Sequence, residues 1–346
     1  MIPAATWPRE KPEEERLLRI DPRARDFVDA RVGDLPSFLR TGDLLVVNDA
    51  ATLPASLRAL RDDGTPLEIR LLAHEGGTST QWRAVLFGRG DWRQRTEDRP
   101  APPRLIEGER LRVAGGALCR VLSVDPASPR LLRIAFEGET ASMWRAIYSG
   151  GRPVQYSYME GPLALWHVQS TFAARPWAVE SPSACRPLTF SVRERLRRRG
   201  VDVAALTHAA GLSSTGDAAL DASLPLEERY DVPPATVRAV TDARARGGRV
   251  VAVGTTVVRA LEGCAAAHGG ELVAGEGSTD LVLGGHSRLR VAEGLLTGIH
   301  ERGTTHFDLM CAFVPRDLLD RAIVHAERAG YVQHEFGDSV LVLPRS

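Results

Sequence analysis

The chain has 346 residues, of which 43% are hydrophobic and 25% are charged, so it can bury a sizeable core and has room for two or three domains. Its 44 lysines and arginines equal its 44 aspartates and glutamates, a balance without the basic excess that dedicated nucleic-acid binders usually carry. The four cysteines form no CxxC pair and no run of 18 apolar residues occurs, so we expect a reduced, cytoplasmic protein without a cysteine zinc site or a membrane span.

The first predicted elements are a short helix, a turn and a strand between residues 32 and 49. The run "LLVV" at residues 44–47 is apolar throughout, which is typical of a strand buried on both faces. Asn48 and Asp49 end this run. A strand of this kind predicts the sheet of an α/β domain.

The segment from Arg58 to Gly150 has a different pattern. Short runs, several of them alternating, are separated by Gly, Pro, Asp and Ser, and this spacing predicts a small antiparallel barrel or sandwich. The runs occupy residues 67–74, 81–88, 109–116, 117–124 and 130–138. We therefore predict an all-β insert at residues 58–150.

The pattern of strands followed by helices returns after residue 187. Helices are predicted at 191–200, 233–248, 255–270, 304–314 and 316–330, and strands at 201–208, 249–253, 280–285, 289–298 and 339–344. Residues 1–57 and 151–346 are therefore expected to share one sheet in an α/β, barrel-like main domain.

A Gly-Thr-Thr tripeptide occurs twice, at residues 254–256 and 303–305, each time at the predicted start of a helix. Free backbone N–H groups there suit a carboxylate or another anion, but a threonine hydroxyl can equally cap the helix itself. Ligands of α/β proteins bind at the carboxyl ends of strands, so two such turns near strand ends favour a ligand site. Neither tripeptide belongs to a P-loop or a GxGxxG fingerprint.

His300 and His208 each follow a predicted strand, so they are candidates for acid–base chemistry in one pocket, or else two surface-loop histidines. His306 lies six residues after His300, whereas helical zinc ligands are four apart, so we expect no metal site. His306 and Asp308 are interpreted as ordinary early helix positions. Cys185 is more simply inert than nucleophilic.

Four segments together resemble the S-adenosylmethionine:tRNA ribosyltransferase-isomerase family of queuosine biosynthesis. They are "GDLLVVNDAATLPASL", "RVVAVGTTVVRALEG", "LLTGIHERGTTHFDLMCAF" and "HEFGDSVLVL", in the family's order and spacing. The resemblance implies an α/β barrel-like domain with an inserted β-barrel. It also implies transfer of the ribosyl part of S-adenosylmethionine to an aminomethyl-deazaguanine base in tRNA, with release of adenine and methionine and without a metal.

The resemblance carries over to individual residues. It implies that His300, His208 and Glu228 are catalytic. It implies that substrate is bound by Asn48, Asp49, Gly254, Thr255, Thr256, Arg259, Thr304, Thr305 and Asp338. Two family motifs are changed: "SPSACRPLTF" stands in place of a histidine-containing segment, and Ser223 and Leu226 replace two histidines near Glu228.

These changes, together with the neutral net charge, lead us to expect an S-adenosylmethionine-dependent enzyme with a non-tRNA or small-molecule acceptor. It would act on the ribosyl or C5′ region by transfer, isomerisation or lyase-type cleavage. One alternative is the family's reaction on tRNA, forming epoxyqueuosine. Another is a non-catalytic protein that binds S-adenosylmethionine.

Overall fold

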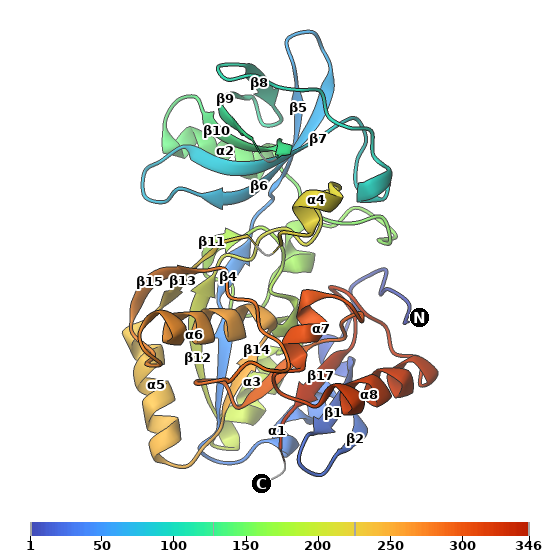
Figure 1. Ribbon diagram of the computed structural model, residues 1–346, viewed down its shortest axis with the longest axis vertical. Coiled ribbons are helices and arrows are strands. Elements are labelled where there is room, and N and C mark those ends of the chain that lie inside the picture. Colours follow the sequence, from blue (N-terminus) through green and yellow to red (C-terminus); the bar gives the residue numbers. More distant parts are fainter. Residues whose placement is uncertain (1, 127, 225, 345–346) are drawn as a thin grey trace.

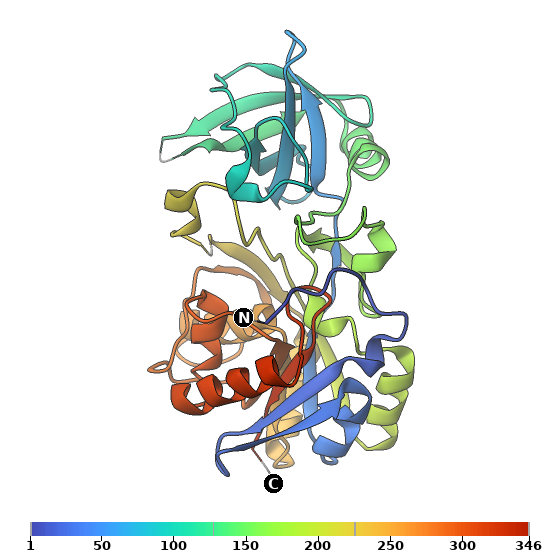
Figure 2. The same cartoon turned by 90° about the vertical axis from the view of Figure 1, so that its right-hand side faces the viewer.

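The computed structural model describes residues 2–126, 128–224 and 226–344 of the chain. A closed barrel lies at one end of the long axis, and a larger part built of a sheet and helices lies at the other (Figure 1). Both chain ends belong to the larger part (Figure 2). The predicted α/β class with an inserted antiparallel β-barrel is confirmed.

The larger part, predicted to be barrel-like, is built on a mixed sheet of nine strands. In pairing order these are β15 (Gly275–Thr279), β13 (Glu228–Val232), β12 (Asp202–His208), β3 (Leu44–Asn48), β14 (Val250–Val253), β16 (Gly294–Gly298), β17 (Ser339–Val342), β1 (Arg16–Asp21) and β2 (Asp26–Arg31). The four central strands β12, β3, β14 and β16 run parallel, so their carboxyl ends meet at one edge.

Helices cover both faces of this sheet. They are α1 (Leu35–Phe38), α3 (Phe190–Arg198), α5 (Pro234–Ala245), α6 (Thr255–Ala267), α7 (Thr305–Met310) and α8 (Arg316–Arg328), with η1 (Pro12–Glu14), η2 (Val32–Asp34), η4 (Leu165–Val168) and η5 (Ser183–Cys185) as short 3-10 turns. No helix within the described ranges is both long and apolar enough to cross a membrane.

The side chains of β3 explain why this strand is apolar throughout. Leu44 and Val46 pack in the core formed with α5, α6 and α8, whereas Leu45 and Val47 pack in the core formed with α1 and α3. Successive side chains of a strand point to opposite faces, so a strand between two helical layers must be apolar at every position.

The barrel is closed by six antiparallel strands. In order they are β10 (Ser128–Phe136), β7 (Gln81–Phe87), β6 (Pro66–His74), β5 (Ser56–Leu60), β8 (Arg110–Val113) and β9 (Ala117–Asp125), with η3 (Thr96–Asp98) in a connecting loop. Of the predicted alternatives, barrel and sandwich, the structure has the barrel. Strand β5 begins at Ser56, before the predicted start of the insert, and the domain division itself stays a prediction.

A helix that the sequence reasoning missed follows the last barrel strand: α2 (Thr140–Gly150). It packs Met143 and Ile147 against the barrel core. Their separation by four residues is the helical spacing that could have revealed it. The insert is therefore not purely β.

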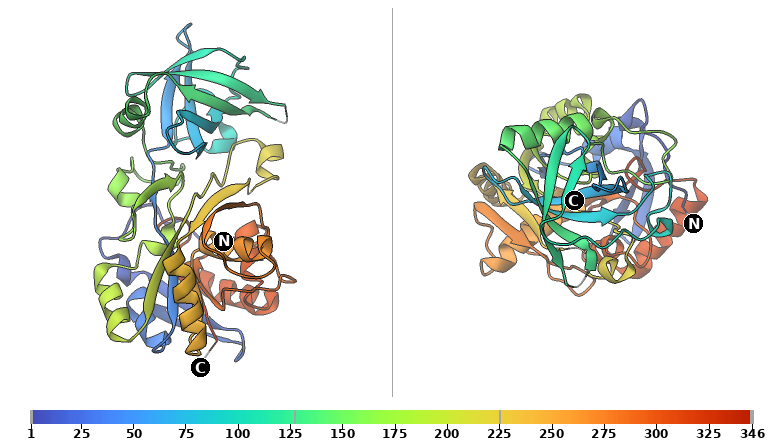
Figure 3. Two further views of the ribbon diagram at one scale, coloured as in Figure 1. Left: turned by 90° about the vertical axis from the view of Figure 1, so that its left-hand side faces the viewer. Right: turned by 90° about the horizontal axis from the view of Figure 1, so that it is seen from above.

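The region between the two parts contains the pair β4 (Ala50–Thr52) and β11 (Arg175–Ala178), and the short helix α4 (Ala218–Asp221) (Figure 1). Viewed from above, the barrel lies over the larger part (Figure 3).

The strand predicted at residues 280–285 is not formed, because the pairing edge is used by β15 directly before it. Instead, the Leu281 amide donates to Thr279 Oγ1, 3.1 Å away. Leu283 is buried through its side chain in the core with α6. Apolar residues here reflect packing of a loop rather than a strand.

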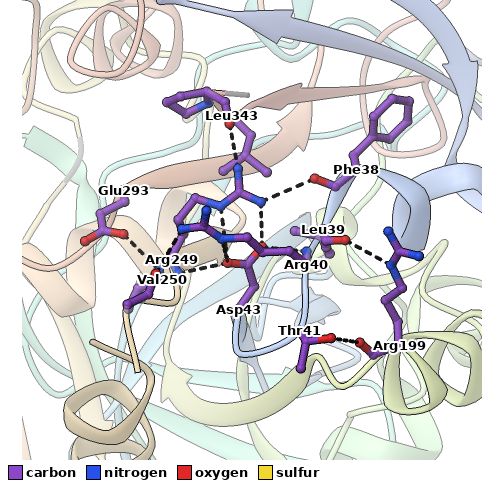
Figure 4. Close-up of polar contacts among 12 residues, drawn as sticks. Phe38, Leu39, Arg40, Thr41, Asp43, Arg199, Arg249, Val250, Glu293 and Leu343 are labelled. Carbon is purple, nitrogen blue, oxygen red and sulfur yellow. Dashed lines mark hydrogen bonds and ion pairs between the residues drawn. The ribbon is translucent and has the colours of Figure 1, made fainter. Parts of the chain in front are cut away.

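The amino end of the central sheet is held by a buried ion pair between Asp43 and Arg249 (Figure 4). Arg249 Nη2 lies 2.6 Å from Asp43 Oδ2, and Nη1 donates to the Pro344 carbonyl at 2.6 Å. Burial would raise the pKa of Asp43, but hydrogen bonds from Arg249 and Arg40 hold it below its usual range. This cluster joins β3, β14 and the chain after β17 at the edge opposite to the carboxyl ends.

Candidate active site

A cavity of about 520 Å³ opens at the carboxyl ends of the parallel strands. Its wall is formed by the segments that follow β12, β14 and β16 and by α6, α7 and β13. Eight of the predicted site residues line it: Glu228, Gly254, Thr255, Thr256, Arg259, His300, Thr304 and Thr305. Segments far apart in the sequence therefore converge where parallel strands of an α/β sheet end.

The first Gly-Thr-Thr turn presents a helix N-terminus to the cavity. Gly254 has a φ of 97°, a region that favours glycine, and its amide donates to the Leu296 carbonyl at 2.7 Å. No side chain caps α6, whereas Thr304 Oγ1 caps α7 by accepting from the Phe307 amide at 3.2 Å. The first turn thus suits an anionic ligand group, and the second is the ordinary capping alternative.

His300 lies in the cavity wall with its ring stacked on His306, at 4.9 Å between centroids and 19° between planes. His300 Nε2 is 2.9 Å from Thr297 Oγ1. Burial, followed by the charges of His306 and His334, holds the pKa of His300 well below its ordinary value. At neutral pH this imidazole is therefore uncharged, and burial makes it a weaker base than a free histidine.

His306 is an early residue of α7, as predicted, and the structure adds that it lines the cavity. Its place in the cavity wall was missed because its partner His300 precedes the helix, so no helical spacing relates the two rings. Asp308, by contrast, makes an ion pair with the exposed Arg316, which agrees with the ordinary interpretation.

Glu228 links His208 and Arg259 at the base of the cavity. Its Oε2 lies 2.5 Å from Arg259 Nη1 and 3.4 Å from His208 Nε2, and its Oε1 accepts from the Gly211 amide at 2.9 Å. Neither ring nitrogen of the buried His208 makes a hydrogen bond with the described residues. Burial raises the pKa of Glu228 against the pull of Arg259, whereas burial and Arg259 together lower the pKa of His208 to about 3.

Two further carboxylates in the wall, Glu180 and Glu335, were missed by the sequence reasoning. Tyr156 donates to Glu180 and Tyr158 donates to Glu335, and burial raises the pKa of both glutamates. His334 stacks on Tyr158 at 4.6 Å and has a φ of 71°, which is strained for a residue other than glycine. In the sequence, the adjacent residues His334 and Glu335 just before Gly337 were the feature from which this part of the cavity wall could have been predicted.

Three predicted binding residues do not line the cavity. Asn48 holds the ends of β3 and β12 together, because its Oδ1 accepts from the His208 amide and its Nδ2 donates to the His208 carbonyl, both at 3.0 Å. Asp49 accepts from Thr207 Oγ1 at 2.6 Å. Asp338 accepts from the amide of Arg16 at 2.9 Å and pairs with Arg9 at 2.7 Å. These three side chains therefore bind neighbouring segments of the fold together and do not line the cavity.

Cys185 is fully buried, and burial raises the pKa of its thiol to about 12. This agrees with the inert interpretation. Among residues 2–126, 128–224 and 226–344, no group of three or more His, Cys, Asp or Glu side chains is arranged to hold a metal ion.

Comparison with known proteins decides the family. The model of the queuosine biosynthesis protein family matches residues 3–342. The chain belongs to this family. It is 33% identical over 344 residues to the S-adenosylmethionine:tRNA ribosyltransferase-isomerase of Acidithiobacillus ferrooxidans, covering 96% of this chain and 92% of the relative. It is 34% identical over 319 residues to the Thermus thermophilus enzyme of the same name, covering 90% of this chain and 88% of that relative.

The fold agrees with a crystal structure of S-adenosylmethionine tRNA ribosyltransferase from Thermotoga maritima. The TM-score is 0.54 at 23% identity, covering 99% of this chain and 98% of the other. The family match and the named relatives confirm the predictions of the family and of a transferase-isomerase enzyme, and S-adenosylmethionine is named as a substrate of those relatives. The relatives favour the tRNA alternative over our leading prediction of a non-tRNA acceptor.

Proposed function

We propose that this protein transfers the ribosyl part of S-adenosylmethionine to an aminomethyl-deazaguanine base of tRNA and isomerises it. The observation that carries the proposal is the convergence of His300, Arg259 and the Gly254–Thr256 turn on one cavity, within a chain that spans its relatives. A volume of about 520 Å³ is within the range of small-molecule sites.

The charges of the cavity suit this substrate. S-adenosylmethionine carries a sulfonium and an ammonium as cations and one carboxylate. The carboxylate would bind at the N-terminus of α6, where the helix dipole and backbone N–H groups favour an anion. Within the described part of the chain, the side-chain partners of Glu180 and Glu335 are hydroxyl donors alone, so these carboxylates would face the cations.

His300 is the proposed general base. The sulfonium acidifies the C5′ hydrogens of the substrate, and the uncharged imidazole can take one of these protons. Glu228 is proposed to act beside the departing adenine as a carboxylate, and His208 and Arg259 position it.

The overall reaction balances without an oxidant or a metal. A C–N bond to the acceptor amine, a ring-closing C–C bond and an epoxide C–O bond form, while the N-glycosidic bond, the ribose ring C–O bond and the C5′–S bond break. The S-adenosylmethionine cation and the amine yield the epoxide-bearing secondary amine, adenine, methionine and one proton.

The test compares S-adenosylmethionine alone, with tRNA carrying guanine, and with tRNA carrying aminomethyl-deazaguanine. We expect adenine and methionine only in the third mixture, together with a heavier nucleoside by mass spectrometry. Release without RNA would refute the tRNA acceptor and support a small-molecule or lyase reaction. Binding without turnover in all three would support the non-catalytic alternative.

A further inference from the structure

A second cavity, of about 200 Å³, lies where the barrel meets the larger part. It is lined by His74 of β6, Trp82 of β7, Trp144 of α2, Trp177 of β11 and Arg229 of β13. Three of the six tryptophans of the chain are thus gathered in one small space. Its volume is below the roughly 300–1,000 Å³ of sites that hold a whole drug-sized molecule, which suits a single ring system belonging to a larger ligand.

His74, Trp144 and Trp177 are half-buried, whereas Trp82 is fully buried. His74 lies 4.7 Å from Trp82 and 5.6 Å from Trp144, between ring centroids, and the two tryptophans meet nearly edge to face at 82°. Opposite them, the Arg229 guanidinium lies 4.1 Å from the centroid of Trp177. Rings and a guanidinium plane of this kind are the surfaces on which proteins stack unpaired nucleobases.

Two arginines lie over the Trp177 ring. The guanidinium of Arg175 is 5.6 Å from its centroid, in addition to that of Arg229. Among the residues that the structure describes, Arg229 is paired only with Glu276, whose side chain is 58% exposed. Cations around an aromatic pocket match the phosphates that flank every base of an RNA strand.

The second cavity and the proposed active site lie on either side of the same backbone segments. Ala209 and Arg229 line the second cavity, whereas their neighbours Ala210 and Glu228 line the first cavity. Since successive residues of a strand point to opposite sides, β13 separates the two cavities. The two cavities are therefore neighbours that share β13 as a common wall.

We propose that the second cavity binds an unstacked nucleobase of the acceptor RNA, other than the base that reacts. This inference rests on the proposed function, because it requires an RNA acceptor. It gives the inserted barrel a role, since β6, β7 and α2 supply one wall and β11 and β13 supply the other.

The test measures the dissociation constant of tRNA carrying aminomethyl-deazaguanine by quenching of tryptophan fluorescence. We expect Trp177→Ala to raise this constant about 5- to 100-fold, the effect of losing one stacked base. Trp177→Phe keeps a stacking ring and should stay within about twofold. Trp166→Ala, with a side chain that is 76% exposed and outside both cavities, is the matched control.

S-adenosylmethionine binding by calorimetry should be equal in all these variants, which also reports correct folding. Unchanged tRNA affinity in Trp177→Ala, with wild-type protein binding tRNA, would overturn this inference alone. If wild-type protein binds no tRNA, both proposals fail. As a measurement that needs no variant, crosslinks from 5-iodouridine-substituted tRNA should map to the peptides containing Trp144 or Trp177, and crosslinks confined elsewhere would overturn the inference.

Discussion

Glu228 and Arg259 offer the sharpest test of how the cavity is held together. Both side chains are about one-tenth exposed, and Arg259 Nη1 lies 2.5 Å from Glu228 Oε2. Removing one partner of a buried ion pair typically lowers the free energy of unfolding by about 3–5 kcal/mol, because the other charge remains buried. We therefore expect Glu228→Gln to lower it by about 3 kcal/mol or more.

The opposite variant, Arg259→Met, should be less harmful. Arginine cannot shed its proton inside a protein, whereas a glutamate left alone can take one up. Loss of Arg259 raises the already elevated pKa of Glu228 further. The destabilisation of Arg259→Met therefore grows as the pH rises from the pKa of an unfolded glutamate, about 4.3, towards the pKa of Glu228 in the folded variant. It shrinks on acidification, because Glu228 then takes up a proton.

The assay is urea unfolding, followed by circular dichroism, of both single variants and the double variant at pH 7.5 and pH 5.5. Because the two residues share one contact, the double variant should be more stable than the sum of the single effects by about 1–3 kcal/mol. Arg238→Met is the control, since Arg238 is exposed on α5. Additive effects, or wild-type stability in Glu228→Gln, would refute the reasoning.

Three further predictions concern other residues. His300→Gln should keep S-adenosylmethionine binding by calorimetry but lower turnover about 100-fold or more, as expected for loss of a general base; full turnover would remove His300 from the mechanism. Asp43→Asn should lower the free energy of unfolding, measured in urea, by about 3–5 kcal/mol at pH 7. Because the pKa of Asp43 is depressed in the folded protein, this difference from wild type should fade as the pH drops below the pKa of an aspartate in the unfolded chain. A difference that stays constant with pH would contradict the ion pair. Thr304→Ala should lower stability by about 1 kcal/mol through loss of the α7 cap, whereas Thr304→Ser should not; equal melting temperatures for the two variants would argue against capping.

Much of the fold was predictable because the signals are local. The run at residues 44–47 is apolar because both faces of its strand are covered, and Gly254 marks a turn that only glycine forms easily. The turn at 254–256 and His300 were found for the same reason, since each directly follows a strand.

The rest of the site depends on long-range packing that no periodicity reports. Glu180 and Glu335 come from irregular segments, 155 residues apart, and meet only through the folded chain. Asp338 was predicted from its motif to bind substrate, but its neighbours Arg9 and Arg16 come from the other end of the chain. A motif gives the identity of a residue and its neighbours in sequence, not the direction of its side chain.

A structure of the protein with bound S-adenosylmethionine tests the central claim most directly. We predict the substrate in the 520 Å³ cavity, with its carboxylate at the N-terminus of α6. Its C5′ carbon should lie within about 3.5 Å of a ring nitrogen of His300, the separation required for reaction. Substrate bound in the cavity between the barrel and β13, or with C5′ turned away from His300, would contradict the account.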